Sequence, residues 1–455
     1  MRTAGRRRRG APPGDRPDEG RGRVRAGGLF RFRRSQILSP PAGVARCSGT
    51  FRRSSGPADR RRPGGSSTIP TPHGSRLVHR VASDAERARR DAELAAMPRV
   101  APAVDQLYDV DKIGIGAYSP LEGFQGSEAV ASVVAHGRLP DGLPWTIPIV
   151  FPVPPAASGA STKGVGVGDE VAIVDGQGRA VAVLRIDEEF PLDRRAIARG
   201  VYATDDAAHP NVADLYAASD RAWAGPITLL RRVEFAPGRV DASPTEMREE
   251  FARRGWRTVA AYQCRNPPHT AHEYIQRLTL EREDVDALLV HPVVGRLKKG
   301  DYRPDVILAA YEALVGQYYP ASRVMVRPLG ITMRYGGPKA ALFLAIVRKN
   351  YGCGVYIVGR DQAGVGKYYD PYACHRIFDE YDLGIVPLRY EESFFCRRCG
   401  WMASEKVCAH DPSNRVATSQ TRIREALASG AELPNEILRP EVAAVLRRPN
   451  VILTE

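Results

Sequence analysis

The pattern of apolar residues changes near Gly225, and this change constrains the fold more than any other feature of the sequence. After it, short apolar strand-like runs alternate with longer stretches of helical periodicity. Strands that alternate with helices predict an α/β layer fold built on a sheet. The expected elements are, in chain order, the strand Thr258–Tyr262, the helix His269–Arg282, the strand Ala287–Val290, the helix Asp305–Gln317, the strand Val324–Val326, the helix Lys339–Lys349 and the strand Gly354–Val358.

Before this change the sequence is dense in strand and turn signals, which predict a small β-rich barrel domain. The run Trp145–Phe151 has the composition of a short strand, and Gly168–Leu184 predicts two strands around a turn that contains Asp-Gly. Towards the C-terminal end a short cysteine-containing segment is followed by a helical tail. The predicted divisions are an extension (1–67), a β-rich domain (68–224), an α/β domain (225–388) and a C-terminal segment (389–455).

The charge is concentrated in the extension. The net charge is +14, and residues 1–67 hold 18 Arg and no Lys against 4 acidic residues, which leaves 48 basic and 48 acidic residues in the remainder. A formally neutral body does not predict a nucleic-acid partner. The extension is rich in Gly and Pro as well as Arg, so we expect it to be disordered. A misassigned start, a basic tail that contacts nucleic acid and a targeting peptide all remain open for it.

The seven cysteines indicate a reducing compartment. Their number is odd and most are scattered, which is not the pattern of a secreted disulfide framework. The N-terminus lacks the apolar core of a secretory signal, and no run of about 18 apolar residues exists that would span a membrane. These features predict a cytoplasmic protein with no membrane partner.

The motif Gln263–His272 has the features of an anion site. It follows a strand and opens a helix, and its prolines suit the first helical turn. His269 and His272 are three residues apart, so they share one helix face. A helix N-terminus carries partial positive charge, and with Arg265 and Asn266 it suits a triphosphate. A metal site or a satisfied surface pair of histidines is the alternative.

The motif Gly359–Gly364 follows an apolar strand, where ligands bind in open α/β sheets. Its glycines permit the backbone to approach a ligand closely, and Arg360 can form two parallel hydrogen bonds with a tetrahedral oxyanion. Alone, it is equally compatible with an ordinary turn that carries a solvated arginine. Two weaker motifs are His291–Gly295, after a strand, and Met333–Lys339, at a junction between a loop and a helix.

Near the C-terminal end, three cysteines and a histidine have the spacing C-x2-C-x8-C-x-H. Three thiolates and an imidazole this close together suit a tetrahedral structural Zn²⁺. Buried thiols or a redox C-x-x-C are the alternatives. The residues are Cys396, Cys399, Cys408 and His410.

Together these motifs resemble the sulfate adenylyltransferase (ATP sulfurylase) family, in its stand-alone prokaryote-type form with a zinc segment. No G-x-x-x-x-G-K-[ST] motif is present, so the adenylylsulfate kinase fused to some relatives is not expected. The family elements Q-x-R-N-P-x-H-x-x-H, H-P-V-V-G, M-R-x-x-G-P and G-R-D-x-A-G match Gln263–His272, His291–Gly295, Met333–Pro338 and Gly359–Gly364, and Gly116–Phe124 and Ala208–Val212 are similar to two further elements.

The resemblance implies a PUA-like β-rich N-terminal domain, a Rossmann-like nucleotidylyltransferase domain and a small zinc-containing helical C-terminal domain. It implies that a sulfate oxygen attacks the α-phosphorus of ATP in line and that adenylyl sulfate and pyrophosphate form, within sulfate assimilation or sulfur metabolism. Mg²⁺ is expected to arrive with ATP and Zn²⁺ to be structural. A homo-oligomer, in particular a dimer, is also implied.

The family's site residues carry over onto matching positions. The catalytic set is Cys264, Arg265, Asn266, His269 and His272; the ATP set is Gln263, Arg265, Asn266, His269, His272, Gly359, Arg360, Asp361, Gln362 and Ile385; the sulfate set is Gln263, Arg265, Arg360 and the backbone of Ala363. Two positions depart from the family pattern: Gln362 replaces a histidine, so it donates a hydrogen bond without charge, and Cys264 replaces a threonine with a weaker donor.

Overall fold

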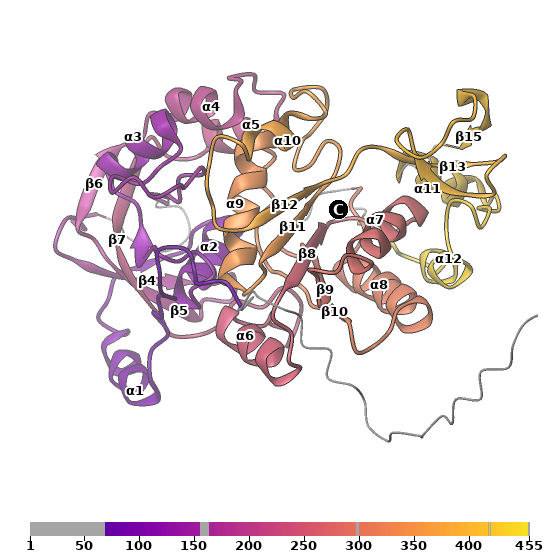
Figure 1. Cartoon of the computed structure of the whole chain (residues 1–455). Helices are drawn as coiled ribbons and strands as arrows, with labels where there is room; N and C mark the ends of the chain where they lie inside the picture. The colour runs from indigo at the N-terminus through magenta and orange to yellow at the C-terminus, as the bar shows by residue number, and fades with distance from the viewer. Residues whose placement is uncertain (1–68, 155–162, 297–299, 417, 419, 454–455) are drawn as a thin grey trace, which may run out of the picture. The chain divides into compact units, whose positions relative to one another are not determined.

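Two large sheets and one small sheet organise the described residues (Figure 1). The computed structural model describes residues 69–154, 163–296, 300–416, 418 and 420–453. The predicted Arg-rich extension therefore lies outside the described residues. None of the helices in the described residues is long and apolar enough to cross a membrane.

The first sheet has seven strands and is organised by its longest strand, β7 (Arg221–Leu229). Its main path is β1-β4-β5-β7-β2, and β3 and β6 also pair with β7. The two strands predicted within Gly168–Leu184 are confirmed as β4 and β5. The other elements are β1 (Arg99–Val100), β2 (Gly123–Phe124), β3 (Phe151–Pro152), β4 (Glu170–Val174), β5 (Ala180–Arg185), β6 (Glu188–Pro191), α1 (Asp84–Glu93), α2 (Val104–Gly114), α3 (Ser127–His136), α4 (Arg194–Tyr202) and α5 (Pro210–Ala217).

The strand predicted over Trp145–Phe151 is wrong for most of its length, because only β3 at its end is a strand. Residues 145–149 are all buried, which accounts for the apolar composition of the run. Pro148, however, has no N–H to give to a ladder. The N–H of Ile149 donates instead to the side chain of Gln125, at 2.7 Å. Most of this run is therefore buried without strand pairing.

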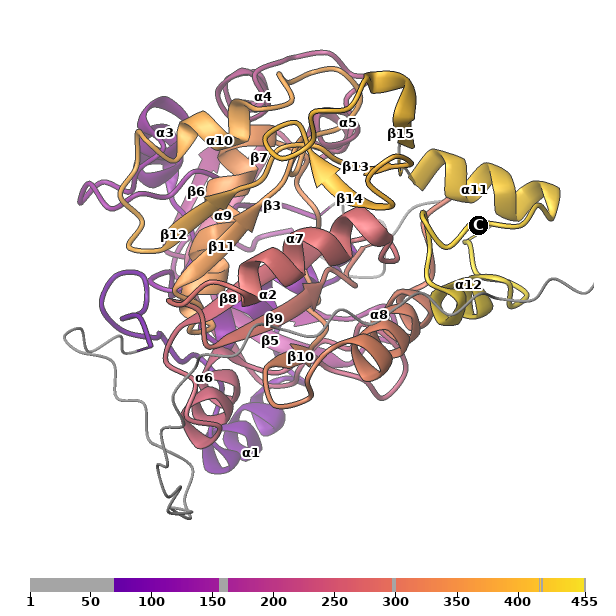
Figure 2. The same cartoon turned by 45° about the vertical axis from the view of Figure 1, so that its right-hand side comes forward.

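The second sheet is fully parallel, with the order β10-β9-β8-β11-β12. Figure 2 shows α7 and α8 on one face of it and α9 on the other. Alternate residues of β8 pack accordingly: Ala260 and Tyr262 join the core under α7 and α8, and Val259 and Ala261 join the core shared with α9 and the first sheet. The elements are α6 (Pro244–Arg253), β8 (Val259–Cys264), α7 (Thr270–Leu280), β9 (Ala287–Pro292), α8 (Pro304–Tyr318), β10 (Val324–Val326), α9 (Gly337–Asn350), β11 (Val355–Val358), α10 (Ala373–Ile377) and β12 (Val386–Arg389).

The strands and helices predicted after Gly225 are all present, with ends that differ by a few residues. α6, α10 and β12 are additional elements. The predicted division at residue 225 falls inside β7, and the division at 388 falls inside β12. The first of these strands belongs to the first sheet along its whole length, so the change of sheet follows Leu229.

The C-terminal segment consists of a three-stranded sheet and two helices. The sheet has the order β14-β13-β15. α12 packs on α8 and completes the core on that face of the parallel sheet. The elements are β13 (Ser393–Cys396), β14 (Trp401–Ser404), β15 (Arg415–Val416), the 3₁₀ helix Pro412–Asn414, α11 (Gln420–Ser429) and α12 (Pro440–Leu446).

Candidate active site

The parallel sheet reverses its strand order between β8 and β11. From β8 the chain proceeds outward through β9 to β10, and α9 then returns it to β11 on the other side of β8. In open α/β sheets, ligands bind at such a reversal, outside the carboxyl ends of the two strands. The motifs that follow β8 and β11 therefore meet at one edge, although they are far apart in sequence.

A cavity of about 350 Å³ lies at this edge, and we call it the switch-point cavity. It brings together Arg265 and Arg360, which the sequence assigns to one anion site. Its predicted lining residues are Gln263, Cys264, Arg265, Asn266, His269, His272, Gly359, Arg360, Asp361, Gln362 and Ala363.

Ile385 does not line this cavity. It lies directly before β12 and is buried in the core. Because β12 runs parallel to β11, its first residue lies at the amino edge of the sheet, whereas Gly359 follows the carboxyl edge. The structure therefore places Ile385 at the edge of the sheet opposite to the cavity.

The two imidazoles form a stacked pair at the start of α7. Their ring centroids are 3.7 Å apart, and His269 is the N-cap residue of the helix. Burial lowers the pKa of His269 well below its ordinary value, and the neighbouring His272 lowers it further. Burial also lowers the pKa of His272 to about 4. The pair is therefore neutral near pH 7 and offers N–H donors, so the positive charge of the cavity comes from its arginines.

The loop after β11 turns sharply enough to present its backbone to the cavity. Asp361 and Ala363 both have φ of 56°, in the left-handed region that non-glycine residues seldom adopt. A Cβ at Gly364 would lie 2.5 Å from the carboxylate of Asp361, so a side chain there would displace that carboxylate. Burial raises the pKa of Asp361, and Arg360 and Arg265 lower it, which places both guanidinium groups near one carboxylate.

Gln362 is tied to a neighbouring site residue through a buried hydroxyl. Its Nε2 donates to the hydroxyl of Tyr356 at 3.1 Å, and that hydroxyl donates to Oε1 of Gln263 at 3.3 Å. Tyr356 is buried on β11. Through Tyr356, Gln362 thus holds the side chain of Gln263 in place, and it adds no charge to the cavity.

The cysteine and histidine ligands predicted near the C-terminal end converge. Their four candidate ligand atoms all lie within 4.8 Å of one another. The Sγ atoms of Cys399 and Cys408 are 3.7 Å apart, and His410 Nδ1 is 3.5 Å from Cys396 Sγ. A tetrahedral ion about 2.3 Å from each sulfur would separate two sulfurs by about 3.8 Å, so the donor set fits a metal ion.

The motif His291–Gly295 lies outside the switch-point cavity. His291 is 1% exposed, and a Cβ at Gly295 would come 2.0 Å from the carbonyl oxygen of Ile331. This glycine therefore permits the close approach of two loops. The motif has a packing role beside the loop that leads to Met333.

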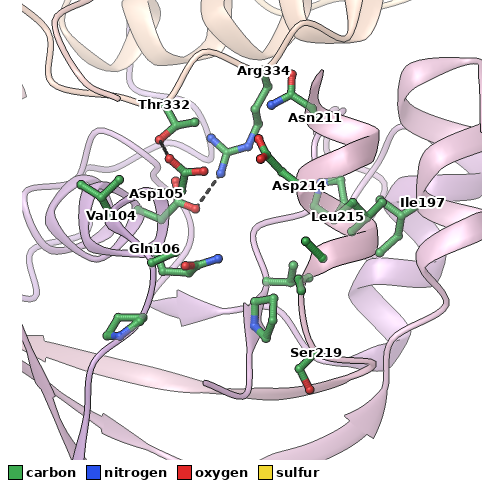
Figure 3. A pocket seen from close by; sticks show the side chains of 18 of the residues that line it. Val104, Asp105, Gln106, Ile197, Asn211, Asp214, Leu215, Ser219, Thr332 and Arg334 are labelled. Carbon is green, nitrogen blue, oxygen red and sulfur yellow. Dashed lines mark hydrogen bonds and ion pairs between the residues drawn. The ribbon is translucent and has the colours of Figure 1, made fainter. Parts of the chain in front are cut away.

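A second cavity of about 460 Å³ lies on the side of the first sheet, between α2, α4 and α5 (Figure 3). Its walls are largely apolar, and Asp105 and Asp214 at its edge are both paired with Arg296. The histidines and arginines predicted for the anion site do not line it. The switch-point cavity is therefore the candidate active site, although it is the smaller of the two.

Comparison with known proteins identifies the family of the chain. The ATP-sulfurylase family model matches residues 238–449, and a PUA-like domain model matches residues 70–232. The sulfate adenylyltransferase of Symbiobacterium thermophilum is 45% identical over 82% of this chain and 95% of its own length, and that of Cenarchaeum symbiosum is 44% identical over 82% and 96%. The chain belongs to the ATP-sulfurylase family.

Likeness of fold extends to a solved structure described as a hexameric APS kinase from Thiobacillus denitrificans. It is 23% identical, with a TM-score of 0.65, and the match covers 84% of this chain and 68% of that chain. At this identity the likeness concerns the fold alone. The predicted PUA-like first domain and α/β second domain are confirmed for this member of the ATP-sulfurylase family.

Several groups of the candidate site were not predicted from the sequence. Arg424 of α11 donates to Oδ1 of Asn266 at 3.3 Å, although no spacing in the sequence indicates it. Met333 belongs to a motif that the sequence singled out without a role. The residues after β12 would have been found if that strand had been predicted, because they follow its carboxyl end. The additional lining residues include Met333, Tyr390, Glu391, Glu392, Ser393 and Thr418.

Proposed function

We propose that this chain is a sulfate adenylyltransferase that joins sulfate to the adenylyl group of ATP and releases pyrophosphate. The observation that supports it most is the meeting of Arg265, Arg360 and the two imidazoles in one cavity at the reversal of strand order. A triphosphate and a divalent oxyanion repel each other, and such a cavity can hold both. MgATP and sulfate are the substrates.

The proposed reaction needs positioning and positive charge, and no general base. Sulfate is fully ionised at neutral pH, so its oxygen attacks the α-phosphorus without losing a proton. We assign Arg265, Arg360, Gln263 and the backbone of Ala363 to sulfate. Holding sulfate in line with the leaving pyrophosphate turns the encounter into an intramolecular step.

The β8–α7 half of the cavity would hold the phosphates. The N-terminus of α7 carries partial positive charge, and Asn266, His269 and His272 lie beside it. The neutral imidazoles donate N–H bonds, and bound phosphate favours their protonated forms because opposite charge raises the pKa of a histidine. Mg²⁺ bound to ATP would neutralise part of the triphosphate charge.

We assign Zn²⁺ to Cys396, Cys399, Cys408 and His410, where it would hold the turn between β13 and β14 in place. β13 begins at Ser393, which lines the switch-point cavity, and ends at Cys396. The metal would therefore support one wall of the cavity and take no part in the chemistry. A homo-oligomer and a cytoplasmic location remain predictions for this chain.

The proposal is tested by following ATP turnover with sulfate and, separately, with molybdate, whose adenylyl adduct hydrolyses. Sulfate-dependent formation of adenylyl sulfate and molybdate-dependent formation of AMP are expected from the wild-type chain loaded with Zn²⁺. If folded, metal-loaded protein gives neither product, the proposal is wrong. Binding of nucleic acid in place of turnover would indicate a non-catalytic protein.

A further inference from the structure

An extended segment, residues 332–335, separates the two cavities and turns alternate side chains to each. Met333 lines the switch-point cavity, and Thr332 and Arg334 line the second cavity. Figure 3 shows Thr332 and Arg334 directed from this segment towards the first sheet's side of the molecule. A shift of this segment would therefore move side chains that line both cavities.

On the switch-point side, the segment contacts two of the residues proposed to bind sulfate. The hydroxyl of Tyr335 accepts a hydrogen bond from Nη1 of Arg265 at 2.9 Å, and the guanidinium lies 4.7 Å from the tyrosine ring centroid. Nε2 of Gln263 donates to Sδ of Met333 at 3.8 Å. The positions of Arg265 and Gln263 thus depend on where this segment lies.

On the other side, α2 of the PUA-like domain binds the segment through two carboxylates. Thr332 donates to Asp105 at 2.9 Å. Arg334 Nη2 lies 2.6 Å from Asp109 Oδ2, and the side chains are 12% and 4% exposed. An ion pair this deeply buried resists separation, because moving one partner away leaves the other charge without compensation.

The backbone of the segment is held by α5. Asn211 Oδ1 accepts from the N–H of Tyr335 at 2.8 Å, and its Nδ2 donates to the carbonyl oxygen of Met333 at 3.4 Å. The ring of His209, the N-cap residue of α5, lies 3.0 Å from the carbonyl oxygen of Tyr335. The PUA-like domain therefore fixes the backbone of Met333 and Tyr335.

We propose that Asn211 and the Asp109–Arg334 ion pair are positioning residues for the sulfate end of the switch-point cavity. They act through residues 332–335 and do not touch substrate. This inference rests on the proposed function and gives the PUA-like domain a part in it. Loosening the segment moves Arg265 and Gln263, and leaves the imidazole pair on α7 in place.

The test compares Asn211→Ala, Arg334→Met and Arg334→Lys with the wild-type chain. Asp214→Asn is the matched control, because Asp214 lies on the same helix as Asn211 but pairs with Arg296 at the surface. For each variant, kcat, the KM for sulfate, the KM for ATP and the thermal midpoint with and without saturating sulfate are measured. The lysine variant keeps the charge that pairs with Asp109.

Asn211→Ala and Arg334→Met are expected to raise the KM for sulfate about tenfold or more, since small misplacements of binding groups cost up to about 100-fold. The KM for ATP should rise by a smaller factor, because the imidazole pair on α7 keeps its place, and Arg334→Lys should recover part of the loss, because its charge still pairs with Asp109. The inference is overturned if both substrates are affected by the same factor, or if the variants match Asp214→Asn.

Failure of the proposed function is distinguishable from failure of this inference. If the wild-type chain makes no adenylyl sulfate, the function is wrong and turnover cannot test positioning. The increase of the thermal midpoint by sulfate is then the deciding measurement. The positioning role is supported if this increase is lost in Asn211→Ala and Arg334→Met and kept in Asp214→Asn. Equal stabilisation by sulfate in all variants contradicts it.

Discussion

Replacing His272 with glutamine should remove part of the acid sensitivity of the folded chain. Burial lowers the pKa of His272 from 6.5 to about 4. The unfolded chain therefore takes up a proton near pH 6.5 that the folded chain takes up only near pH 4, and the free energy of unfolding falls as the pH drops through this window. The difference is worth about 3 kcal/mol, at about 1.4 kcal/mol per pKa unit.

The prediction is measured by urea unfolding between about pH 7 and about pH 4, where folded and unfolded chains differ in protonation. Wild type should lose about 3 kcal/mol more than His272→Gln across this range. Buried His73, whose pKa burial also lowers to about 4, contributes equally to both proteins and cancels. The exposed His79 provides the control for a histidine-to-glutamine replacement outside the core. If the free energies of unfolding of wild type and His272→Gln differ by the same amount at every pH, His272 is not a neutral, buried imidazole.

Arg265→Ala and Arg360→Ala should each lower turnover by about 100-fold or more with unchanged thermal midpoints, since each removes charge from where anions meet; near-wild-type rates in either would contradict the sulfate assignment. MgATP should bind more tightly as the pH falls from about 7 to about 5.5, because phosphate raises the pKa of the imidazole pair; calorimetry in buffers of different ionisation enthalpy should detect proton uptake, and its absence would place the phosphates elsewhere. Cys399→Ser should reduce the zinc content and the thermal midpoint while turnover per folded molecule persists; a fully metal-loaded variant of wild-type stability would remove Cys399 from the ligand set.

Most of the site was predictable from the sequence because its residues follow strands. The motif after β8 and the loop after β11 are each local, and the rule that ligands bind at carboxyl ends of strands places both at one edge. It was harder to predict that β8 and β11 are neighbours in the sheet, because this depends on α9 returning the chain to the other side of β8. Ile385 illustrates the limit: its sequence position is close to the site motifs, but it precedes its strand and so lies at the opposite edge.

The charge state of the histidines could not be predicted from residue type. The sequence placed His269 and His272 at one anion site without giving their charge, and burial lowers both pKa values, so that both rings are neutral near pH 7. Burial depends on packing that comes from distant elements, including α11, whose Arg424 reaches Asn266. For the same reason the sequence assigned no role to Asn211, because its partners on residues 332–335 are brought to it by tertiary structure.

The central claim, that sulfate and ATP occupy one cavity and react directly, is tested most simply by isotope exchange. Labelled pyrophosphate is incubated with ATP and the zinc-loaded chain, with and without sulfate, and label in ATP is followed. Direct attack by sulfate predicts exchange that requires sulfate and disappears in Arg265→Ala. Exchange without sulfate would reveal an adenylyl-enzyme intermediate, and no exchange even with sulfate would mean that the two anions do not react in this cavity.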